Sequence, residues 1–407
     1  MNLAATLSQL RRHLHRNPEL GFEEHETSAF LRGWLEERGF ETVGPLAGTG
    51  FYVDIAGRRA GATTGYRADM DALPVMDAKE VPYASTKPGV AHLCGHDAHM
   101  ATACGVLVLL QERQNEIAGR VRVFFQPNEE RPPSGAPRMI ADGVLDGLDA
   151  VYAIHVDPTL SVGRFGLRAG AITAACAPFL VRISTGRTGG HSARPHETVD
   201  TVWLATQIAT QYYQLAGRVA DARKTSIITI CRFEAGDALN VIPSDVEMGG
   251  MLRCADAETF AYLRDKMRRV AGSAGALYGA DVAVEFVDSL PAVMNTEEEV
   301  AIVRDAATAL FGADAPREVM PSMGGEDFAF YLERIPGAMV RVGSASGSDT
   351  RYPLHHQRFD VDEAALPLAA RLMAETLARS NERPRAPRGP REALTASAPN
   401  GGNGGLG

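Results

Sequence analysis

The sequence predicts an α/β fold in which strands and helices alternate and a second, smaller domain is inserted. Short apolar runs typical of buried strands are separated by stretches with helical periodicity. Chemically versatile side chains follow several of these runs, as at the ligand-binding edge of an open α/β sheet. Over 175–290 the order of elements changes to β-α-β-β-α-β, the split βαβ unit of ferredoxin-like domains.

Residues 1–174 are expected to form the first part of the larger, catalytic domain. Leucines recur at helical spacing from Leu3 to Leu14, which predicts an amphipathic opening helix that ends before Pro18. A second helix is predicted over 27–38. Beyond it, strands are predicted at 51–56, 64–68, 121–125 and 150–154, and a helix at 100–110.

Three of these strands lead into side chains that can bind a cation or move a proton. The side chains concerned are Asp71, Glu129, Glu130 and His155, the last at the expected end of its strand. Ligands of open α/β sheets bind in the crevice outside the carboxyl ends of the strands. We therefore expect these side chains to converge on one crevice with Cys94 and His96.

A thiol and an imidazole two residues apart, Cys94 and His96, precede the helix predicted at 100–110. Thiolate and neutral imidazole are the usual ligands of zinc-like metals. The pair is predicted to lie just ahead of the helix N-terminus, whose partial positive charge would lower the pKa of the Cys94 thiol. Such a pair alone is more often a small buried cysteine and a hydrogen-bonded histidine, so the metal hypothesis needs partners elsewhere.

Residues 175–290 are expected to fold as the inserted domain. Its strands are predicted at 177–184, 225–233, 245–252 and 282–286, and its helices at 199–216 and 257–277.

The α/β pattern resumes over 291–380, the second part of the catalytic domain, with helices at 297–311, 328–333 and 362–380 and a strand at 338–342. Glu326 and Asp327 are expected to cap the helix at 328–333, with support of a metal ligand as the alternative. Residues 381–407, rich in Pro, Arg, Gly and Asn, are expected to be a disordered tail.

Composition excludes several classes of function. The net charge of -9, without a basic run in the body of the chain, argues against nucleic-acid binding, so we expect small-molecule partners. Five scattered cysteines fit a reducing compartment. The N-terminus lacks a signal-peptide pattern and no apolar run could span a bilayer, so a cytoplasmic protein without a membrane contact is expected. A Gly-X-Ser-X-Gly elbow and a P-loop are both missing from the sequence, which argues against a serine hydrolase and a nucleotide enzyme.

Eight motifs follow one another in a characteristic order along the chain. They are Arg67-Ala-Asp-Met-Asp-Ala-Leu-Pro74, Cys94-Gly-His-Asp97, Phe125-Gln-Pro-Asn-Glu-Glu130, Ile154-His-Val156, Gly189-Gly-His191 with Pro195-His196, Asn240-Val-Ile-Pro243, Gly325-Glu-Asp-Phe328 and Leu354-His355. This series resembles the M20 family of metallohydrolases, and within it the amidohydrolase branch of aminoacylases, hippurate hydrolases and hydrolases of auxin-amino acid conjugates. The resemblance extends over the chain up to about Arg379.

The resemblance implies a fold and an activity. The fold is a catalytic α/β domain with a central mixed sheet and an inserted ferredoxin-like lid domain through which two chains form a homodimer. The activity is metal-dependent hydrolysis of the amide bond of N-acyl amino acids or similar small N-acyl amines, which releases a carboxylic acid and an amine. A dinuclear dipeptidase or carboxypeptidase of the same fold is the alternative, and a binding protein that keeps the fold without catalysis is the rival from another class.

The resemblance also implies roles for single residues. Glu129 matches the general base, and His191 matches a histidine that reaches the active site of the partner subunit and stabilises the oxyanion. Asn240 and Arg253 match substrate-binding positions, where the guanidinium fork of Arg253 suits a free carboxylate. Apart from the resemblance, Asp71 is expected to hold a metal ligand or water by a hydrogen bond, with the capping of a turn as the alternative. The metal ligands are matched by Cys94, His96, Glu130, His155 and His355.

Two divalent cations are implied by this ligand set. Mixed Cys, His and Glu ligands suit zinc, with manganese, cobalt and nickel as alternatives. Cys94 stands where related peptidases have a bridging Asp, so it is expected to bridge the two metals. The sequence differs from the usual pattern of the amidohydrolase branch at Arg131-Pro-Pro-Ser-Gly135 and at His356-Gln357. Both differences lie next to expected metal ligands without removing any, so they are expected to change the substrate pocket.

Overall fold

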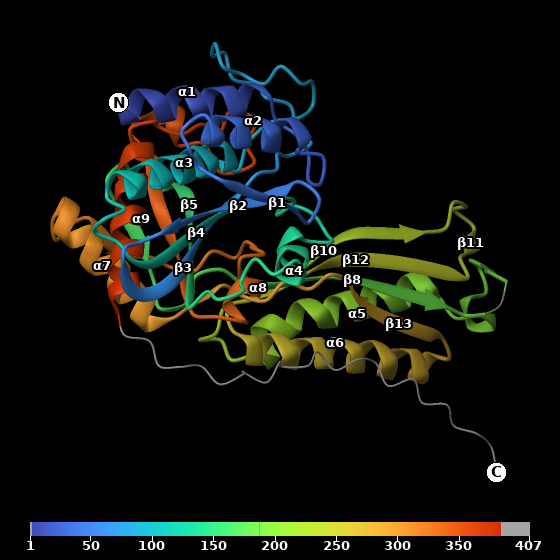
Figure 1. Cartoon of the computed structure of the whole chain (residues 1–407). Helices are drawn as coiled ribbons and strands as arrows, with labels where there is room; N and C mark the ends of the chain where they lie inside the picture. Colours follow the sequence, from blue (N-terminus) through green and yellow to red (C-terminus); the bar gives the residue numbers. More distant parts are fainter. Residues whose placement is uncertain (1, 187, 384–407) are drawn as a thin grey trace.

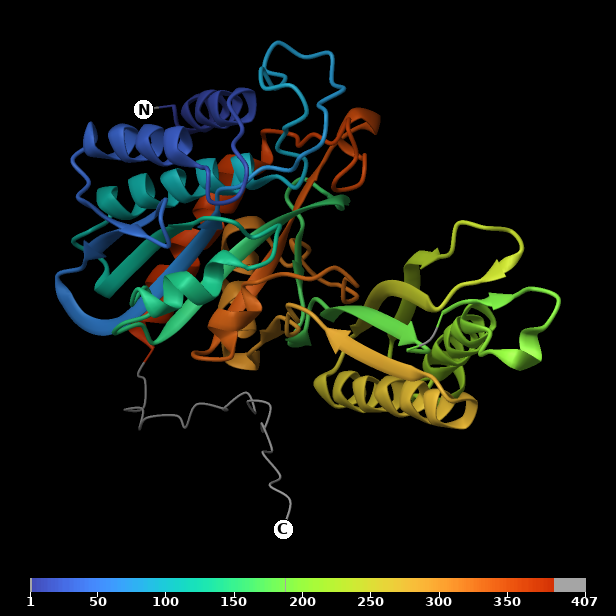
Figure 2. The same ribbon diagram turned by 90° about the vertical axis from the view of Figure 1, so that its right-hand side faces the viewer.

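A mixed eight-stranded sheet and a separate four-stranded sheet organise the chain, as a computed structural model shows for residues 2–186 and 188–383 (Figure 1). We call the part around the eight-stranded sheet the larger lobe. The part from the first to the last strand of the four-stranded sheet, residues 175–286, is the smaller lobe. Figure 2 shows the smaller lobe standing beside the larger one, joined to it by extended segments.

The sheet of the larger lobe has the order β1-β2-β4-β3-β5-β16-β6-β15. Its inner strands β4, β3, β5 and β16 run parallel to one another, whereas β2 joins them antiparallel to β4. The strands are β1 (Thr42–Leu46), β2 (Gly50–Ala56), β3 (Arg59–Asp69), β4 (Ala118–Gln126), β5 (Ala150–Ser161), β6 (Phe165–Leu167), β15 (Pro316–Glu318) and β16 (Gly337–Ala345). The α/β class with a mixed sheet is thereby confirmed.

Helices cover both faces of this sheet. On one face lie α1, α3, α7 and α9, whose apolar side chains share one core with sheet residues such as Tyr66 and Val123; α2 packs against the same core. On the other face lie α4 and α8, which pack around Phe124 and Val151. Strands buried on both faces explain the nearly continuous apolar runs of the sequence. The helices are α1 (Leu3–Arg16), α2 (His25–Glu36), α3 (His96–Glu112), α4 (Gly135–Ala141), α7 (Glu297–Phe311), α8 (Ala329–Leu332) and α9 (Ala365–Glu382).

The smaller lobe follows the element order β8-α5-β10-β12-α6-β13, and its antiparallel sheet has the order β10-β12-β8-β13. Its own core packs residues such as Val181, Leu204, Met248 and Leu263 between the sheet and the two helices. Asp200 and Asp256 cap these helices by accepting bonds from Trp203 N (2.9 Å) and Thr259 N (3.0 Å). The elements are β8 (Ala175–Ser184), α5 (Thr201–Gln214), β10 (Ser226–Ala235), β12 (Asp245–Cys254), α6 (Ala257–Tyr278) and β13 (Asp281–Phe286).

Short elements complete the described chain. Strands β9 (Gly190–His191) and β11 (Val241–Ile242) pair as a small ribbon at the end of the smaller lobe that points away from the larger one (Figure 1). Strands β7 (Gly170–Ala171) and β14 (Met294–Asn295) pair where the chain enters and leaves the smaller lobe. Single turns occupy Pro195–Glu197, Leu215–Val219 and Ser348–Thr350. No helix of the described residues is long and apolar enough to cross a membrane.

Several predicted element ends were wrong, among them those of β5, α3 and α9. Strand β5 continues through His155 to Ser161, so His155 lies within a strand and not at its end. Helix α3 begins at His96, earlier than the apolar run predicted. Helix α9 continues to Glu382, because buried Asn381 donates to the carbonyls of Ala118 (2.8 Å) and Arg120 (3.1 Å) and so ties the last turn to the sheet. The rest of the predicted tail, 384–407, lies outside the described residues.

Candidate metal centre and substrate pocket

A cavity of about 650 Å³ opens between the two lobes. Strands and loops of the larger lobe contribute Cys94, Glu129, Glu130, His155 and His355 to its lining. The smaller lobe contributes Arg253 and apolar side chains such as Met251 and Pro178. The cavity therefore holds both chemically reactive groups and a surface that could hold a substrate.

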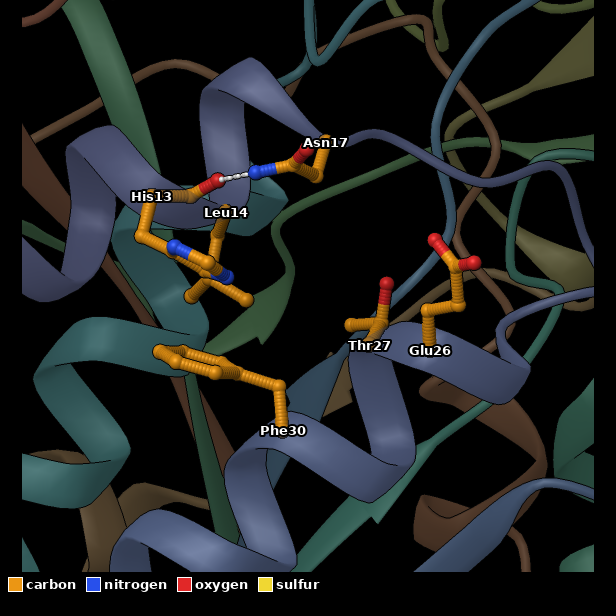
Figure 3. Close-up of a pocket in the computed structure, with 6 residues that line it drawn as sticks. All are labelled: His13, Leu14, Asn17, Glu26, Thr27 and Phe30. Carbon is orange, nitrogen blue, oxygen red and sulfur yellow. Dashed lines mark hydrogen bonds between the residues drawn. The ribbon is translucent and has the colours of Figure 1, made fainter.

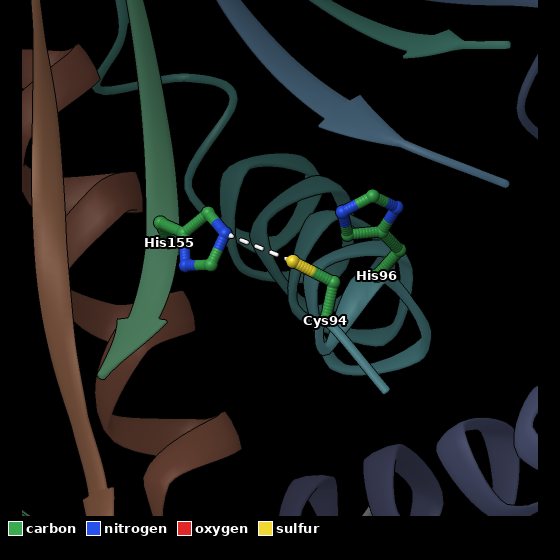
Figure 4. A group of neighbouring side chains, drawn as sticks. All are labelled: Cys94, His96 and His155. Carbon is green, nitrogen blue, oxygen red and sulfur yellow. Dashed lines mark hydrogen bonds between the residues drawn. The ribbon is translucent and has the colours of Figure 1, made fainter. Parts of the chain in front are cut away.

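All five residues predicted to be metal ligands meet beside this cavity. Ligand atoms of Cys94, His96 and His155 lie within 4.8 Å of one another, and so do those of Cys94, Glu130 and His355. Figure 4 shows the thiol of Cys94 directed between the rings of His155 and His96, with Sγ 3.5 Å from His155 Nε2. Cys94 thus belongs to two neighbouring groups of candidate ligands, which is the position that a bridging ligand needs.

The turn at Gly95 places Cys94 and His96 on either side of one backbone bend. Gly95 has a φ of 90°, and a side chain there would collide with Val156, so only glycine fits. His355 has a φ of 68°, and its amide donates to Leu93 O at 2.8 Å, which holds it beside Cys94. Non-glycine residues in this region of φ and ψ are costly and tend to cluster at functional sites.

The paired glutamates follow β4 in a loop that is fixed by Asn128. The backbone N–H of Asn128, which has a φ of 50°, donates to Glu24 Oε1 at 2.9 Å. The side-chain amide of Asn128 donates to the carbonyls of Arg131 and Pro133 at 2.8 Å each. Asparagine tolerates this left-handed conformation better than most residues. Glu129 and Glu130 are therefore presented to the cavity by a rigid turn.

Asp71 contacts two of the candidate ligands, His96 and Glu130. His96 Nδ1 lies 2.9 Å from Asp71 O and 3.3 Å from Asp71 Oδ1, while Asp71 Oδ2 accepts from Glu130 N at 3.0 Å. Nδ1 therefore donates to Asp71, and Nε2 is the ring nitrogen left to face the other candidate ligands. His96 Nε2 and Glu130 Oε1 are buried and have no hydrogen-bond partner among the described residues. Buried polar atoms of this kind require an explanation, and a cation would supply it.

The electrostatics of the cluster depend on its acids. Burial, with the charges of Glu130 and Glu129, raises the pKa of the Cys94 thiol well above its usual value. The prediction that the helix N-terminus lowers this pKa was therefore wrong, because burial and two carboxylates outweigh the helix dipole. A coordinated cation reverses this balance, since a metal-bound thiol is deprotonated outright. Burial and His99 lower the pKa of His155 to about 3, so His155 is neutral and able to ligate.

A buried network behind Glu129 surrounds Arg67. The guanidinium contacts Asp69 (2.5 Å), Asp327 (2.7 Å) and Glu326 (3.1 Å), and its Nε donates to Gln126 Oε1 at 2.9 Å. Three carboxylates thus share one cation in the interior. Burial, reinforced by Glu326, Glu130 and Asp327, raises the pKa of Glu129 well above its usual value.

Several members of this outer layer were missed or given another role by the sequence. Glu326 Oε1 accepts from Phe328 N at 2.9 Å in the turn before α8, but α8 has no side-chain cap, and Glu326 also pairs with Arg67. His99 links Asp69 to strand β5: its Nδ1 donates to Asp69 Oδ1 (2.7 Å), and its Nε2 accepts from Val156 N (3.0 Å). Arg67, Asp69, Gln126, Glu326 and Asp327 all lie in the quoted motifs, but the motifs do not show that these side chains meet.

Three residues with predicted roles in substrate handling lie in two different places. Arg253 of β12 lines the cavity and donates to Met323 O (2.6 Å) and Cys176 Sγ (3.2 Å). His191 and Asn240 are exposed on the distant ribbon of the smaller lobe and do not line the cavity of their own chain. The structure therefore brings Arg253 to the cluster but not the other two.

A second, smaller cavity lies between α1 and α2 (Figure 3). His13 stacks on Phe30 in it, with ring centroids 3.8 Å apart, and Asn17 Nδ2 donates to His13 O at 2.8 Å. Burial lowers the pKa of His13. Its lining contains none of the candidate ligands, so the cavity between the lobes is the candidate site.

Comparisons with known proteins find hydrolases that are similar to most of this chain. Residues 65–379 match the model of the peptidase family M20/M25/M40. N-acetyl-L-cysteine deacetylase of Bacillus subtilis is 37% identical over 94% of this chain and 91% of its own length. Thermostable carboxypeptidase 2 of Saccharolobus solfataricus is 36% identical over 89% of this chain and 92% of its own length.

A solved structure and a longer relative complete the comparison. The structure, a dinuclear metal binding peptidase of the M20 family from Bacillus subtilis, has a TM-score of 0.82 and 34% identity over 93% of this chain and 98% of its own. A relative from Rhodococcus jostii is 39% identical over 88% of this chain, which spans 45% of that relative's length.

Proposed function

This chain belongs to the peptidase family M20/M25/M40 and is a metal-dependent amidohydrolase, and we propose that its substrates are N-acyl amino acids or similar small N-acyl amines. The observation that carries the proposal is that Cys94, Glu129, Glu130, His155 and His355 line one cavity, with buried His96 directly beside them. The relative named N-acetyl-L-cysteine deacetylase supports an acyl amino acid as substrate.

The five converging residues are the proposed ligands of two divalent cations. His96 Nε2 and Glu130 Oε1 are buried without a hydrogen bond among the described residues, which supports this assignment. The solved neighbour named as a dinuclear metal binding peptidase supports it too. The two groups that include Cys94 support a bridging thiolate. A set of one thiolate, three imidazoles and one carboxylate suits zinc, and manganese, cobalt and nickel are the alternatives to test.

Hydrolysis assigns a separate task to each of the paired glutamates. The bound cations would supply a water of lowered pKa and polarise the carbonyl of the scissile amide. Glu129, which has no place among the five ligands, takes the proton from that water and passes it to the leaving nitrogen. Burial and the neighbouring acids raise the pKa of Glu129. Nearby cations would lower it again, which would favour the ionised form that accepts the proton.

The smaller lobe is proposed to be a ferredoxin-like lid domain, inserted over 175–290 between catalytic segments 1–174 and 291–380. Its β-α-β-β-α-β order and its sheet order support that assignment. Exposed aromatic side chains such as Trp203, Tyr213 and Phe233 support its role in forming a homodimer. All five cysteines are unpaired, which supports a cytoplasmic, reducing location.

The partner's His191 is proposed to complete each active site, with Asn240 nearby on the same ribbon. The exposed position of this ribbon, away from its own cavity, supports action across the dimer. We expect His191→Ala to lose about 10²- to 10³-fold in turnover, the usual cost of one oxyanion donor. Mixing His191→Ala with a Glu129→Gln chain should restore activity, because a mixed dimer contains one intact site; a mixture as inactive as its parts would contradict the exchange.

A dipeptidase or carboxypeptidase of the same fold is the competing function, and the relative named thermostable carboxypeptidase 2 favours testing it. Metal-loaded protein should be assayed with N-acetyl and N-benzoyl amino acids and with dipeptides of the same amino acids. We expect higher kcat/KM for the N-acyl amino acids. Preference for dipeptides would establish the competing function, and binding without any cleavage would establish a non-catalytic protein.

A further inference from the structure

An arginine occupies the centre of an otherwise buried strand of the main sheet. In β16 every residue but Arg341 is buried, and no other residue of this strand carries a charge. Taking a guanidinium out of water is costly unless it is well paired, so packing alone does not account for arginine here. The side chain of Arg341 keeps 20% of its surface exposed and lines the cavity between the lobes.

The partners of Arg341 leave most of its hydrogen-bonding capacity unused. Within the described residues, the guanidinium lies 3.4 Å from Asp157 Oδ2 and donates to Ile172 O at 3.1 Å. Asp157 is largely satisfied elsewhere, because its Oδ1 accepts from Thr159 N (2.8 Å) and Thr159 Oγ1 (2.6 Å). A guanidinium has five donors, and a strong carboxylate pair would be bidentate and shorter. Arg341 is therefore held in place without being fully engaged.

The position of Arg341 relates it directly to the metal cluster. It is paired in register with His155 on the neighbouring parallel strand β5, so both side chains stand on the same face of the sheet. The guanidinium therefore projects into the cavity beside a proposed metal ligand. A group attached to the scissile amide would lie within the reach of this side chain.

A second guanidinium enters the same cavity from the smaller lobe. Arg253, already proposed to bind the free carboxylate of the substrate, reaches the cavity from β12. Two guanidinium groups from two different sheets thus face one substrate space. A single carboxylate, as in an N-acetyl derivative of a neutral amino acid, can engage only one of them in a bidentate pair.

From these contacts we infer that Arg341 determines specificity by binding a second carboxylate of the substrate, so that the preferred substrates are N-acyl amino acids with two carboxylates. This inference rests on the proposed function and narrows its substrate class. The second carboxylate can belong to the acyl group, as in N-succinyl-alanine, or to the amino acid, as in N-acetyl-glutamate. Both sources present the same chemistry to Arg341.

The test compares each dicarboxylate with a neutral counterpart of similar size on metal-loaded protein. N-succinyl-alanine is paired with N-butanoyl-alanine, and N-acetyl-glutamate with N-acetyl-glutamine. At least one dicarboxylate should have a kcat/KM about 10- to 100-fold above its counterpart, because a site built to bind a charged group discriminates against its absence. The pair that shows the preference identifies the source of the second carboxylate.

Substitution of Arg341 then assigns the preference to this residue. Arg341→Met introduces the residue found at Met339 on the same face of the strand. It should lower the ratio of kcat/KM between the dicarboxylate and its neutral counterpart toward one. Arg341→Lys should retain part of it, because lysine keeps the charge without the fork. Arg304 of α7, whose side chain is 43% exposed and does not line the cavity, provides the control, and Arg304→Met should keep the wild-type preference. Where Arg341→Met folds poorly in thermal melts, the lysine variant carries the test.

Three results would overturn the inference. The first is equal kcat/KM for both members of both pairs, which leaves the proposed function standing. The second is a dicarboxylate preference that keeps its wild-type size in both Arg341→Met and Arg341→Lys. The third is an equal loss on dicarboxylate and neutral substrates in both variants, which would indicate a structural role. Failure to cleave any N-acyl amino acid would contradict the proposed function itself, and the inference with it.

Discussion

Glu129→Gln is expected to retain its metal and lose about 10²- to 10⁴-fold in turnover, the usual contribution of a general base. Glutamine has almost the shape of glutamate but cannot accept the proton of the attacking water. The Glu129→Gln variant should keep its fold, because burial and the charges of Glu326, Glu130 and Asp327 already oppose the ionised form of Glu129. The measurements are metal content by elemental analysis and kcat with an N-acetyl amino acid.

The adjacent residue provides the matched comparison for this prediction. Glu130→Gln should lose bound metal as well as activity, because Glu130 belongs to a group of candidate ligands with Cys94 and His355 that does not include Glu129. The two variants differ by one position in the same rigid loop, so a general effect on folding would change both alike. A Glu129→Gln protein with wild-type turnover, or one that had lost its metal, would contradict the assignment of the base.

Much of the fold could be predicted from local patterns because the main strands are buried on both faces. Their apolar runs and the helical periodicities between them marked most of the inner strands and long helices, and α7 matches its predicted range of 297–311. Short elements such as β6 (Phe165–Leu167) and β15 (Pro316–Glu318) were not predicted. They are held by pairing with distant strands, and a three-residue segment has no periodicity of its own.

The candidate metal ligands could be identified from sequence motifs, whereas the contacts of the residues around them could not. Arg67 and Asp327 are separated by 260 positions and meet only because β3 and the loop before α8 lie behind the same cavity. The direction of the Cys94 pKa was predicted from one local effect, the helix N-terminus. The structure adds burial and the carboxylates of Glu129 and Glu130, which come from another part of the chain and outweigh that effect.

Removal of the metals is expected to abolish hydrolysis. The cavity concentrates carboxylates around Cys94 and His96, and the field of Asp69, Asp71 and Glu130 raises the pKa of His96 to about 10 despite its burial. The same negative field favours a bound cation. Because a cation bound only by the folded state stabilises it, the melting temperature should also fall on chelation and rise again with added metal.

Cys94→Ser tests whether the thiolate is needed to hold two cations together. A hydroxyl is a poorer ligand for zinc-like metals than a thiolate, so we expect weaker binding of metal and lower activity. Cys104, which is buried within α3 and absent from every group of candidate ligands, provides the control. Cys104→Ala should keep both metals. A Cys94→Ser protein with both metals and full activity would remove the bridging role.

The central claim is that a dinuclear metal site at Cys94, His96, Glu130, His155 and His355 performs amide hydrolysis. The most direct measurement is a titration of chelator-treated protein with zinc, in which bound metal per chain and the rate of N-acetyl amino acid hydrolysis are followed together. We predict no hydrolysis before metal is added and a rate that reaches its maximum at two bound ions per chain. Full activity after complete removal of metal would contradict the claim.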